Sequence, residues 1–123
     1  MTMPIGSSQS EATRDVTAFL AAVDASDGTG DPVATAAAAS LVTITATSLP
    51  APAQPVWRDL TRLLKASSDE PLPLRAIEAM RSWPKTRITQ LIDLTRKLQS
   101  ILQQHDNDRW EDEIRDKLRH NYL

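Results

Sequence analysis

The chain has 123 residues, of which 41% are hydrophobic and 24% charged, and its 14 basic residues nearly balance its 16 acidic ones. A chain of this length and composition folds as one domain with one modest core, which excludes wholesale disorder. The absence of cysteine excludes disulfide bonds and thiol catalysis and is typical of a reducing compartment.

The N-terminal half predicts a cytoplasmic protein without a membrane segment. No basic residue precedes Arg14 and no long apolar run lies nearby, so we expect no secretory signal. The uncharged run 32–57 is rich in Ala, Thr, Ser and Pro, which makes it too weakly apolar for a good spanning helix. We expect a flexible tail over 1–7 and a single helical domain over 8–123.

Capping signals predict the first two helices. Ser8 and Glu11 have the spacing of a capping box, and apolar residues recur after them at helical intervals. This pattern predicts a helix over about 9–25, which the glycine-containing turn at 27–30 ends. Asp31, which a proline follows, is a typical N-cap and predicts the start of the second helix.

Two segments after the second helix have ambiguous patterns. Residues 42–47 alternate apolar and hydroxyl side chains, as a strand does. No other segment offers this strand a partner, so we expect helix there, with strand pairing across a dimer as the alternative. The proline-rich run 50–55 predicts a stiff, polyproline-like connector. Its alternative interpretation is a ligand for a proline-binding module.

Two shorter helices are predicted next, separated by a loop at 67–73, where prolines disfavour helix. The third helix begins at Pro55, and the fourth ends or bends at Pro84. Each presents one apolar face. These faces consist of Val56, Trp57, Leu60, Leu63 and Leu64 in the third helix and Leu74, Ile77, Met80 and Trp83 in the fourth.

The stretch 85–105 is the central element of the prediction. Its apolar residues cover about half of a helix circumference, which indicates packing against two neighbours. We expect the helix to break at the polar residues 106–108 and a separate helix to follow over 109–122, with a ridge of Trp110, Ile114, Leu118 and Tyr122. The sequence thus predicts an all-α bundle of five or six helices. The apolar residues of the central stretch are Ile88, Leu91, Ile92, Leu94, Leu98, Ile101 and Leu102.

No motif in the sequence predicts catalysis. The two histidines, His105 and His120, lie in polar surroundings without the partners of a catalytic triad or a metal site. The three glycines form no phosphate-binding loop. We therefore predict a non-catalytic protein with no cofactor and no metal site.

Surplus apolar helix surface instead predicts an accessory, adaptor or assembly protein that acts through helix–helix contacts, with a protein partner or a second copy. The alternative is a nucleic-acid-associated regulator, because residues 75–97 hold six bases and two acids. The predicted partner-binding residues are Leu91, Leu94, Leu98, Ile101, Trp110, Ile114 and Leu118. The predicted nucleic-acid contacts are Arg81, Lys85, Arg87, Arg96 and Lys97.

Overall fold

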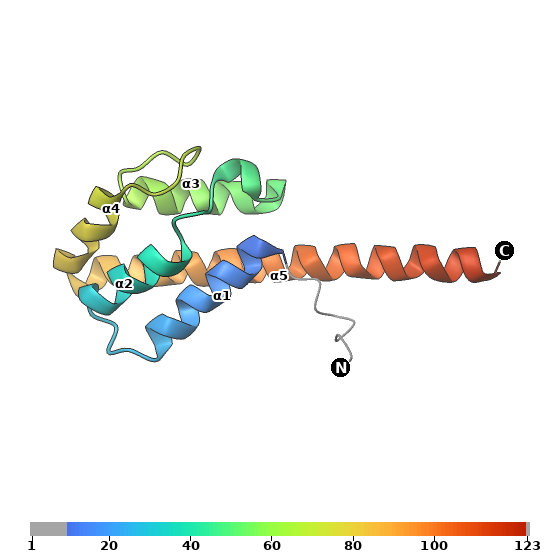
Figure 1. Cartoon of the computed structure of the whole chain (residues 1–123), viewed down its shortest axis with the longest axis horizontal. Helices are drawn as coiled ribbons and strands as arrows, with labels where there is room; N and C mark the ends of the chain where they lie inside the picture. The colour runs from blue at the N-terminus through green and yellow to red at the C-terminus, as the bar shows by residue number, and fades with distance from the viewer. Residues whose placement is uncertain (1–9, 123) are drawn as a thin grey trace.

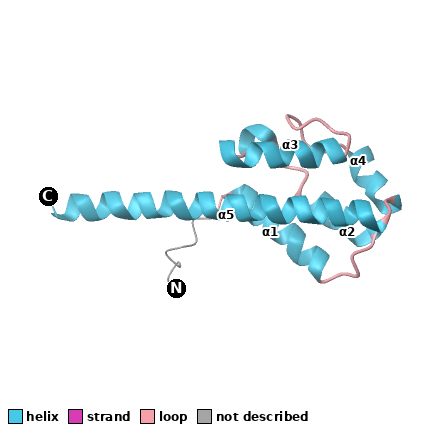
Figure 2. Ribbon diagram, turned by 180° about the vertical axis from the view of Figure 1, so that it is seen from behind, coloured by secondary structure: helices cyan, strands magenta, loops and turns pink. Residues whose placement is uncertain are grey.

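A computed structural model describes the backbone of residues 10–122 and the side chains of residues 10–119. The predicted tail at 1–7 and Ser8 of the predicted capping box lie outside these residues. Within the described chain every regular element is helical, which confirms the predicted all-α bundle (Figures 1 and 2). The elements are α1 (Glu11–Asp24), α2 (Gly30–Ser40), α3 (Gln54–Leu63), α4 (Leu74–Ala79) and α5 (Lys85–Tyr122), with 3₁₀ turns η1 (Ala46–Ser48), η2 (Ala51–Ala53) and η3 (Met80–Ser82).

Helices α1 and α2 form where the sequence predicted them, with different caps. Ser10 caps α1, and its hydroxyl accepts a hydrogen bond from the backbone N–H of Thr13 at 3.2 Å. Helix α2 begins at Gly30, two residues before the expected first turn. A Cβ atom at Gly30 would lie 2.7 Å from the carbonyl oxygen of Arg81 and closer still to that of Met80. Glycine at this position therefore lets α2 start against the backbone of η3.

The segment between α2 and α3 is neither helix nor strand over most of its length, so the helix predicted for 42–47 is wrong. Helix α2 ends at Ser40, and within 42–47 the only regular structure is the beginning of the short turn η1. Local hydroxyl bonds account for the difference: the backbone N–H of Thr45 donates to Ser48 Oγ at 3.0 Å, and Ser48 Oγ donates to the Thr45 carbonyl at 2.7 Å. Such bonds give the backbone an alternative to helix.

The proline-rich run 50–55 is mostly helical, so the prediction of a polyproline-like connector is wrong. Pro50 is extended, with φ −64° and ψ 154°, but residues 51–53 form η2 and α3 begins at Gln54. Proline fits the first turn of a helix because no intrahelical partner needs its missing N–H there. The run therefore starts α3 instead of spacing it from α2.

A residue with a left-handed backbone follows the end of helix α3. Lys65 has φ +54°, and the N–H of Ala66 donates to the carbonyl of Thr61 at 2.9 Å. This bond, with that from the Lys65 N–H to the Arg62 carbonyl at 3.1 Å, is the pattern of a Schellman cap. The cap turns the chain into the loop that the sequence predicted at 67–73.

Helix α4 is short and crosses the end of the bundle (Figure 1). Ile77 and Met80 are buried as predicted, but Leu74 is 70% exposed, and the prediction that it lines the inner face is wrong. Leu72 from the preceding loop is buried instead. The backbone is extended at Trp83, the conformation that a residue before proline prefers. Pro84 therefore separates α4 and η3 from α5.

Helix α5 runs without interruption from Lys85 to Tyr122, so the predicted break at 106–108 is wrong. This segment contains no glycine or proline, and Asp and Asn each cost only about 0.5 kcal/mol relative to alanine within a helix. Asp106, which lies in the predicted break, is buried and accepts hydrogen bonds from the start of α1. A tertiary contact therefore holds this residue inside a continuous helix.

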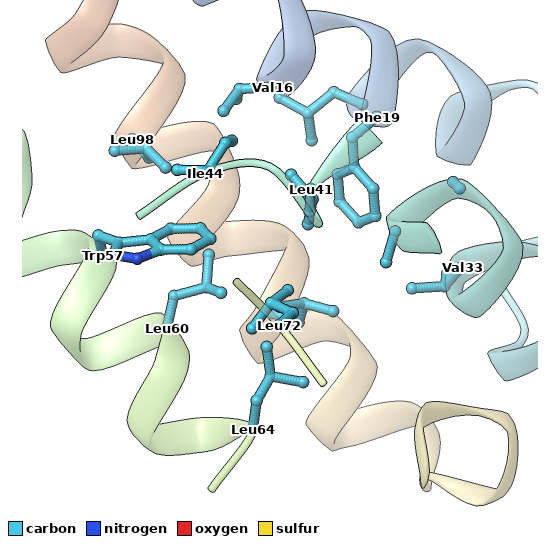
Figure 3. Packing of buried hydrophobic residues seen from close by; sticks show 14 of the residues in the cluster. Val16, Phe19, Val33, Leu41, Ile44, Trp57, Leu60, Leu64, Leu72 and Leu98 are labelled. Atoms are coloured by element: carbon cyan, nitrogen blue, oxygen red, sulfur yellow. The ribbon is translucent and has the colours of Figure 1, made fainter. Parts of the chain in front are cut away.

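Helix α5 lies between α1 and α3, which confirms its central place and its two neighbours. Its contacts with α1 pair Thr13 with Asp106 and Thr17 with Gln99, so the two helices are antiparallel. Apolar side chains from all five α-helices meet in one core (Figure 3). Trp57 is fully buried in this core. Trp57 Nε1 donates to the Ser68 carbonyl at 3.3 Å, which satisfies its one polar group.

Candidate protein-interaction surface

The C-terminal part of α5 extends past the other described elements. Asp106 is the last buried residue of this helix among those with described side chains. Beyond it the helix continues for four turns and projects from the bundle (Figures 1 and 2). We call residues 107–122 the arm. A helix normally buries one face against another element, so a projecting arm is a candidate contact surface.

The arm carries an apolar ridge that consists of Trp110, Ile114 and Leu118. Residues four apart are neighbours on a helix, so the three side chains lie one above another. Trp110 and Ile114 are half-buried, and Leu118 is 51% exposed. The remaining described side chains of the arm are polar and exposed. The structure thus brings together these three predicted partner-binding residues. The predicted fourth member of the ridge, Tyr122, lies beyond the described side chains.

The other predicted partner-binding residues lie in or beside the core. Leu91 and Leu98 are fully buried within the chain, so neither can contribute to an outer surface. Leu94 and Ile101 are half-buried and pack against the core, Leu94 beside α3 and Ile101 beside Pro52 of η2. The wide apolar face of α5 was thus predicted correctly, but α1 and α3 cover most of it.

The arm leaves the bundle at a hydrogen-bonded junction between α1 and α5. Thr13 Oγ1 donates to Asp106 Oδ2 at 2.6 Å, and the Ser10 N–H donates to the same oxygen at 3.2 Å. Arg109 Nη2 lies 3.9 Å from the other oxygen, Oδ1. A carboxylate at a helix N-terminus is favourable because the free N–H groups there carry partial positive charge. Sequence reasoning missed this role, although Asp106 continues the buried face four residues after Leu102.

A groove of about 600 Å³ lies between α3 and α5. Arg87 forms part of its wall: Nη2 donates to the Leu63 carbonyl at 2.8 Å, and the guanidinium lies 4.6 Å from the centre of the Trp83 ring. A cation at the C-terminal end of α3 is favourable, and stacking on an aromatic face adds to it. These contacts give Arg87 a structural part at the junction of α3 and α5. The groove is lined by Asp59, Arg62, Leu63, Arg87, Gln90, Asp93 and Leu94.

The basic residues predicted to contact nucleic acid are spread over different contacts. Arg81 forms ion pairs with Asp31 and Glu78 at 3.3 and 3.0 Å, and Arg96 pairs with Asp24 at 2.7 Å. The hydrogen bonds that Arg81 donates to the carboxylates of Glu78 and Asp31 raise the pKa of Arg81. Lys85 and Lys97 are exposed. Three of the five cations, Arg87 included, therefore hold elements of the bundle together.

Among the side chains of residues 10–119 no cluster of three metal-binding groups is found. None of the helices over residues 10–122 combines the length and the apolar character needed to cross a membrane. Comparison of the chain with protein-family models, with curated proteins and with solved structures finds no match. The arm and its ridge are therefore the features from which a function can be argued.

Proposed function

We propose that this protein is a non-catalytic adaptor or assembly protein that acts through helix–helix contact, with the arm as its contact element. The observation that carries the proposal is the position of the ridge. Trp110, Ile114 and Leu118 lie on a helix that continues out of the bundle, and Leu118 is one of two large hydrophobic side chains that the described chain leaves exposed.

The energetic argument compares the arm with the rest of α5. Up to Asp106 the helix is supported by α1 and α3, and its apolar side chains are either buried in the core or packed against it. Beyond Asp106 the ridge is only partly covered, and covering the exposed half of a side chain of this size stabilises an assembly by about 1 kcal/mol. Tryptophan, as at position 110, is a common anchor of protein interfaces. A partner helix laid along the ridge would cover all three residues.

The basic segment supports the alternative function less well. Arg81, Arg87 and Arg96 already make intramolecular contacts, and a nucleic-acid surface needs cations directed at successive phosphates. The observations therefore favour contact with a helix.

Site-specific photo-crosslinking in cells that express the protein naturally would test the proposal. We expect a crosslinker at position 118, on the ridge, to give a discrete adduct with another chain, either a different protein or a second copy of this one. A matched crosslinker at position 116 lies 200° away around the helix and should give none. Equal labelling from both positions, or no adduct from position 118, would contradict the proposal.

A further inference from the structure

The charges of the arm are divided along its length. Residues 107–113 hold four acids and one base, whereas residues 114–119 hold three bases and one acid. Ile114 marks the boundary and is also the middle residue of the ridge. A helix of this kind presents opposite charge to a copy of itself only when the two run in opposite directions.

The charged neighbours of the ridge strengthen this argument. At 100° per residue, Glu111 and Arg115 lie on one side of the ridge, and Glu113 and Lys117 lie on the other. All four side chains are exposed, and Arg115 also forms a solvated ion pair with Asp112 of its own helix at 3.5 Å. Each side therefore carries an acid toward the bundle and a base toward the tip of the arm.

We infer that the arm pairs with the arm of a second copy of this chain, antiparallel, about a two-fold axis at Ile114. In that arrangement each side of one ridge meets the same side of the other. Glu111 then faces Arg115 of the second copy, and Glu113 faces Lys117 of the second copy. A parallel, in-register pair would instead bring the two acids together and the two bases together, which opposes association.

The apolar residues fit the same axis. Trp110 and Leu118 are each four residues from Ile114, so Trp110 lies beside Leu118 of the second copy, and the two Ile114 side chains meet. Such an interface is isologous and closes as a dimer. Sixteen helical residues span about 24 Å, so the two bundles lie at opposite ends of the paired arms. The small area and the rim position of the charges predict a weak, salt-sensitive dimer.

This inference rests on the proposed function, and the experiment separates the two. Light scattering and sedimentation equilibrium on the purified full chain, from micromolar to millimolar concentration, should show a reversible monomer–dimer equilibrium that weakens as salt rises. A monomer at every concentration would overturn the inference. The proposed function would still stand if the crosslinker at position 118 captured a different protein.

Leu118→Glu should abolish the dimer and leave the helix content and melting temperature of the monomer unchanged, since Leu118 is outside the core. Leu74→Glu is the matched control, because Leu74 is 70% exposed but lies on α4, away from the arm. This change should leave the dimer intact. A dimer that survives Leu118→Glu, or that Leu74→Glu disrupts equally, would overturn the inference.

Direction is tested by charge reversal. Glu111→Arg should weaken the antiparallel dimer at least several-fold, because it places a base opposite Arg115 of the second copy, and the added change Arg115→Glu should restore it. The same single change would strengthen a parallel dimer, because it places a base opposite Glu113 of the second copy. Strengthening by Glu111→Arg would therefore overturn the antiparallel arrangement.

Disulfide trapping gives an independent measure, because the chain has no cysteine of its own. Positions 107 and 121 are equally distant from Ile114, and both are asparagine. Oxidation of an equimolar mixture of Asn107→Cys and Asn121→Cys chains should trap mainly the mixed pair. Predominance of the two like pairs would overturn the inference.

Discussion

The junction between α1 and α5 gives the sharpest test of the structure. Asp106 is 7% exposed and Thr13 is fully buried, and the hydroxyl of Thr13 donates to the carboxylate at 2.6 Å. A hydrogen bond to a charged group contributes about 1.5–3 kcal/mol, and loss of one partner leaves the other unsatisfied. We expect Asp106→Ala to lower the free energy of unfolding by about 2–4 kcal/mol, because it also removes the bond from the Ser10 N–H.

The two partners should be coupled. Thr13→Val keeps the shape of the side chain and removes its donor, which should cost about 1.5–3 kcal/mol. The double variant Thr13→Val/Asp106→Ala should be more stable than the sum of the single effects predicts, by at least about 1 kcal/mol. The ion pair with Arg109, at 3.9 Å and half-exposed, is too long and too solvated to account for such a coupling.

Urea unfolding followed by far-ultraviolet circular dichroism measures all three variants. Asp108→Ala is the matched control: this acid is exposed, two residues along the same helix, and its removal should change stability by no more than about 0.5 kcal/mol. Additivity of the two single effects within about 0.5 kcal/mol would refute the hydrogen bond as the tie between α1 and α5. So would equal losses from Asp106→Ala and Asp108→Ala.

Three further predictions concern single positions. Gly30→Ala should lower the free energy of unfolding by about 1–3 kcal/mol, because its Cβ would strike the carbonyl oxygen of Met80; a neutral result in thermal unfolding would contradict this contact. Lys65→Gly should stabilise the chain by about 1 kcal/mol, since φ is +54° there, and a loss would show that this cap is not left-handed. Hydrogen bonds from the Thr29 hydroxyl and N–H lower the pKa of Asp27, so this carboxyl stabilises the fold above its ordinary pKa and ceases to do so as the pH falls through the lowered value. Thr29→Val should raise the pKa of Asp27 in an NMR titration, and an unchanged value would contradict the bond.

The all-α class and the central helix could be predicted because the evidence for them is local. The apolar residues of 88–102 recur at helical spacing, and a stripe that covers half of the circumference needs two neighbours. The structure supplies α1 and α3 as those neighbours. Pro84 marks a true helix end, and proline limits backbone geometry in the same way wherever it occurs.

Two failed predictions, at 106–108 and at 42–47, have different physical causes. The sequence of 106–108 resembles a helix start, but Asp106 contacts a segment more than ninety residues earlier. The period-two pattern of 42–47 reflects a segment in which Leu41, Ile44 and Ala46 are buried while hydroxyls bond locally. At 106–108 a tertiary contact decided against the break, and at 42–47 local hydroxyl bonds and burial together decided against the helix.

For the candidate surface, the sequence pattern could not separate the apolar residues that the bundle covers from those that it leaves exposed. Leu98 and Leu118 look alike in an apolar pattern, yet the first is fully buried and the second is 51% exposed. Leu98 lies in the part of α5 that α1 and α3 cover, and Leu118 lies beyond it. How far this cover extends depends on how the helices pack. Burial therefore removes Leu91 and Leu98 from the predicted partner surface and leaves the ridge of Trp110, Ile114 and Leu118 accessible.

The continuity of α5 links the bundle to the arm. A separate helix over 109–122 would be only 14 residues long, and isolated helices of that length are marginal in water. Here the bundle has already formed the first turns of α5, so the arm extends an existing helix and needs no nucleation of its own. The junction at Asp106 ties α5 to the start of α1 at the point where the arm leaves. The core therefore fixes the position of the ridge, and a partner helix would meet a surface that is already formed, which lowers the entropic cost of binding.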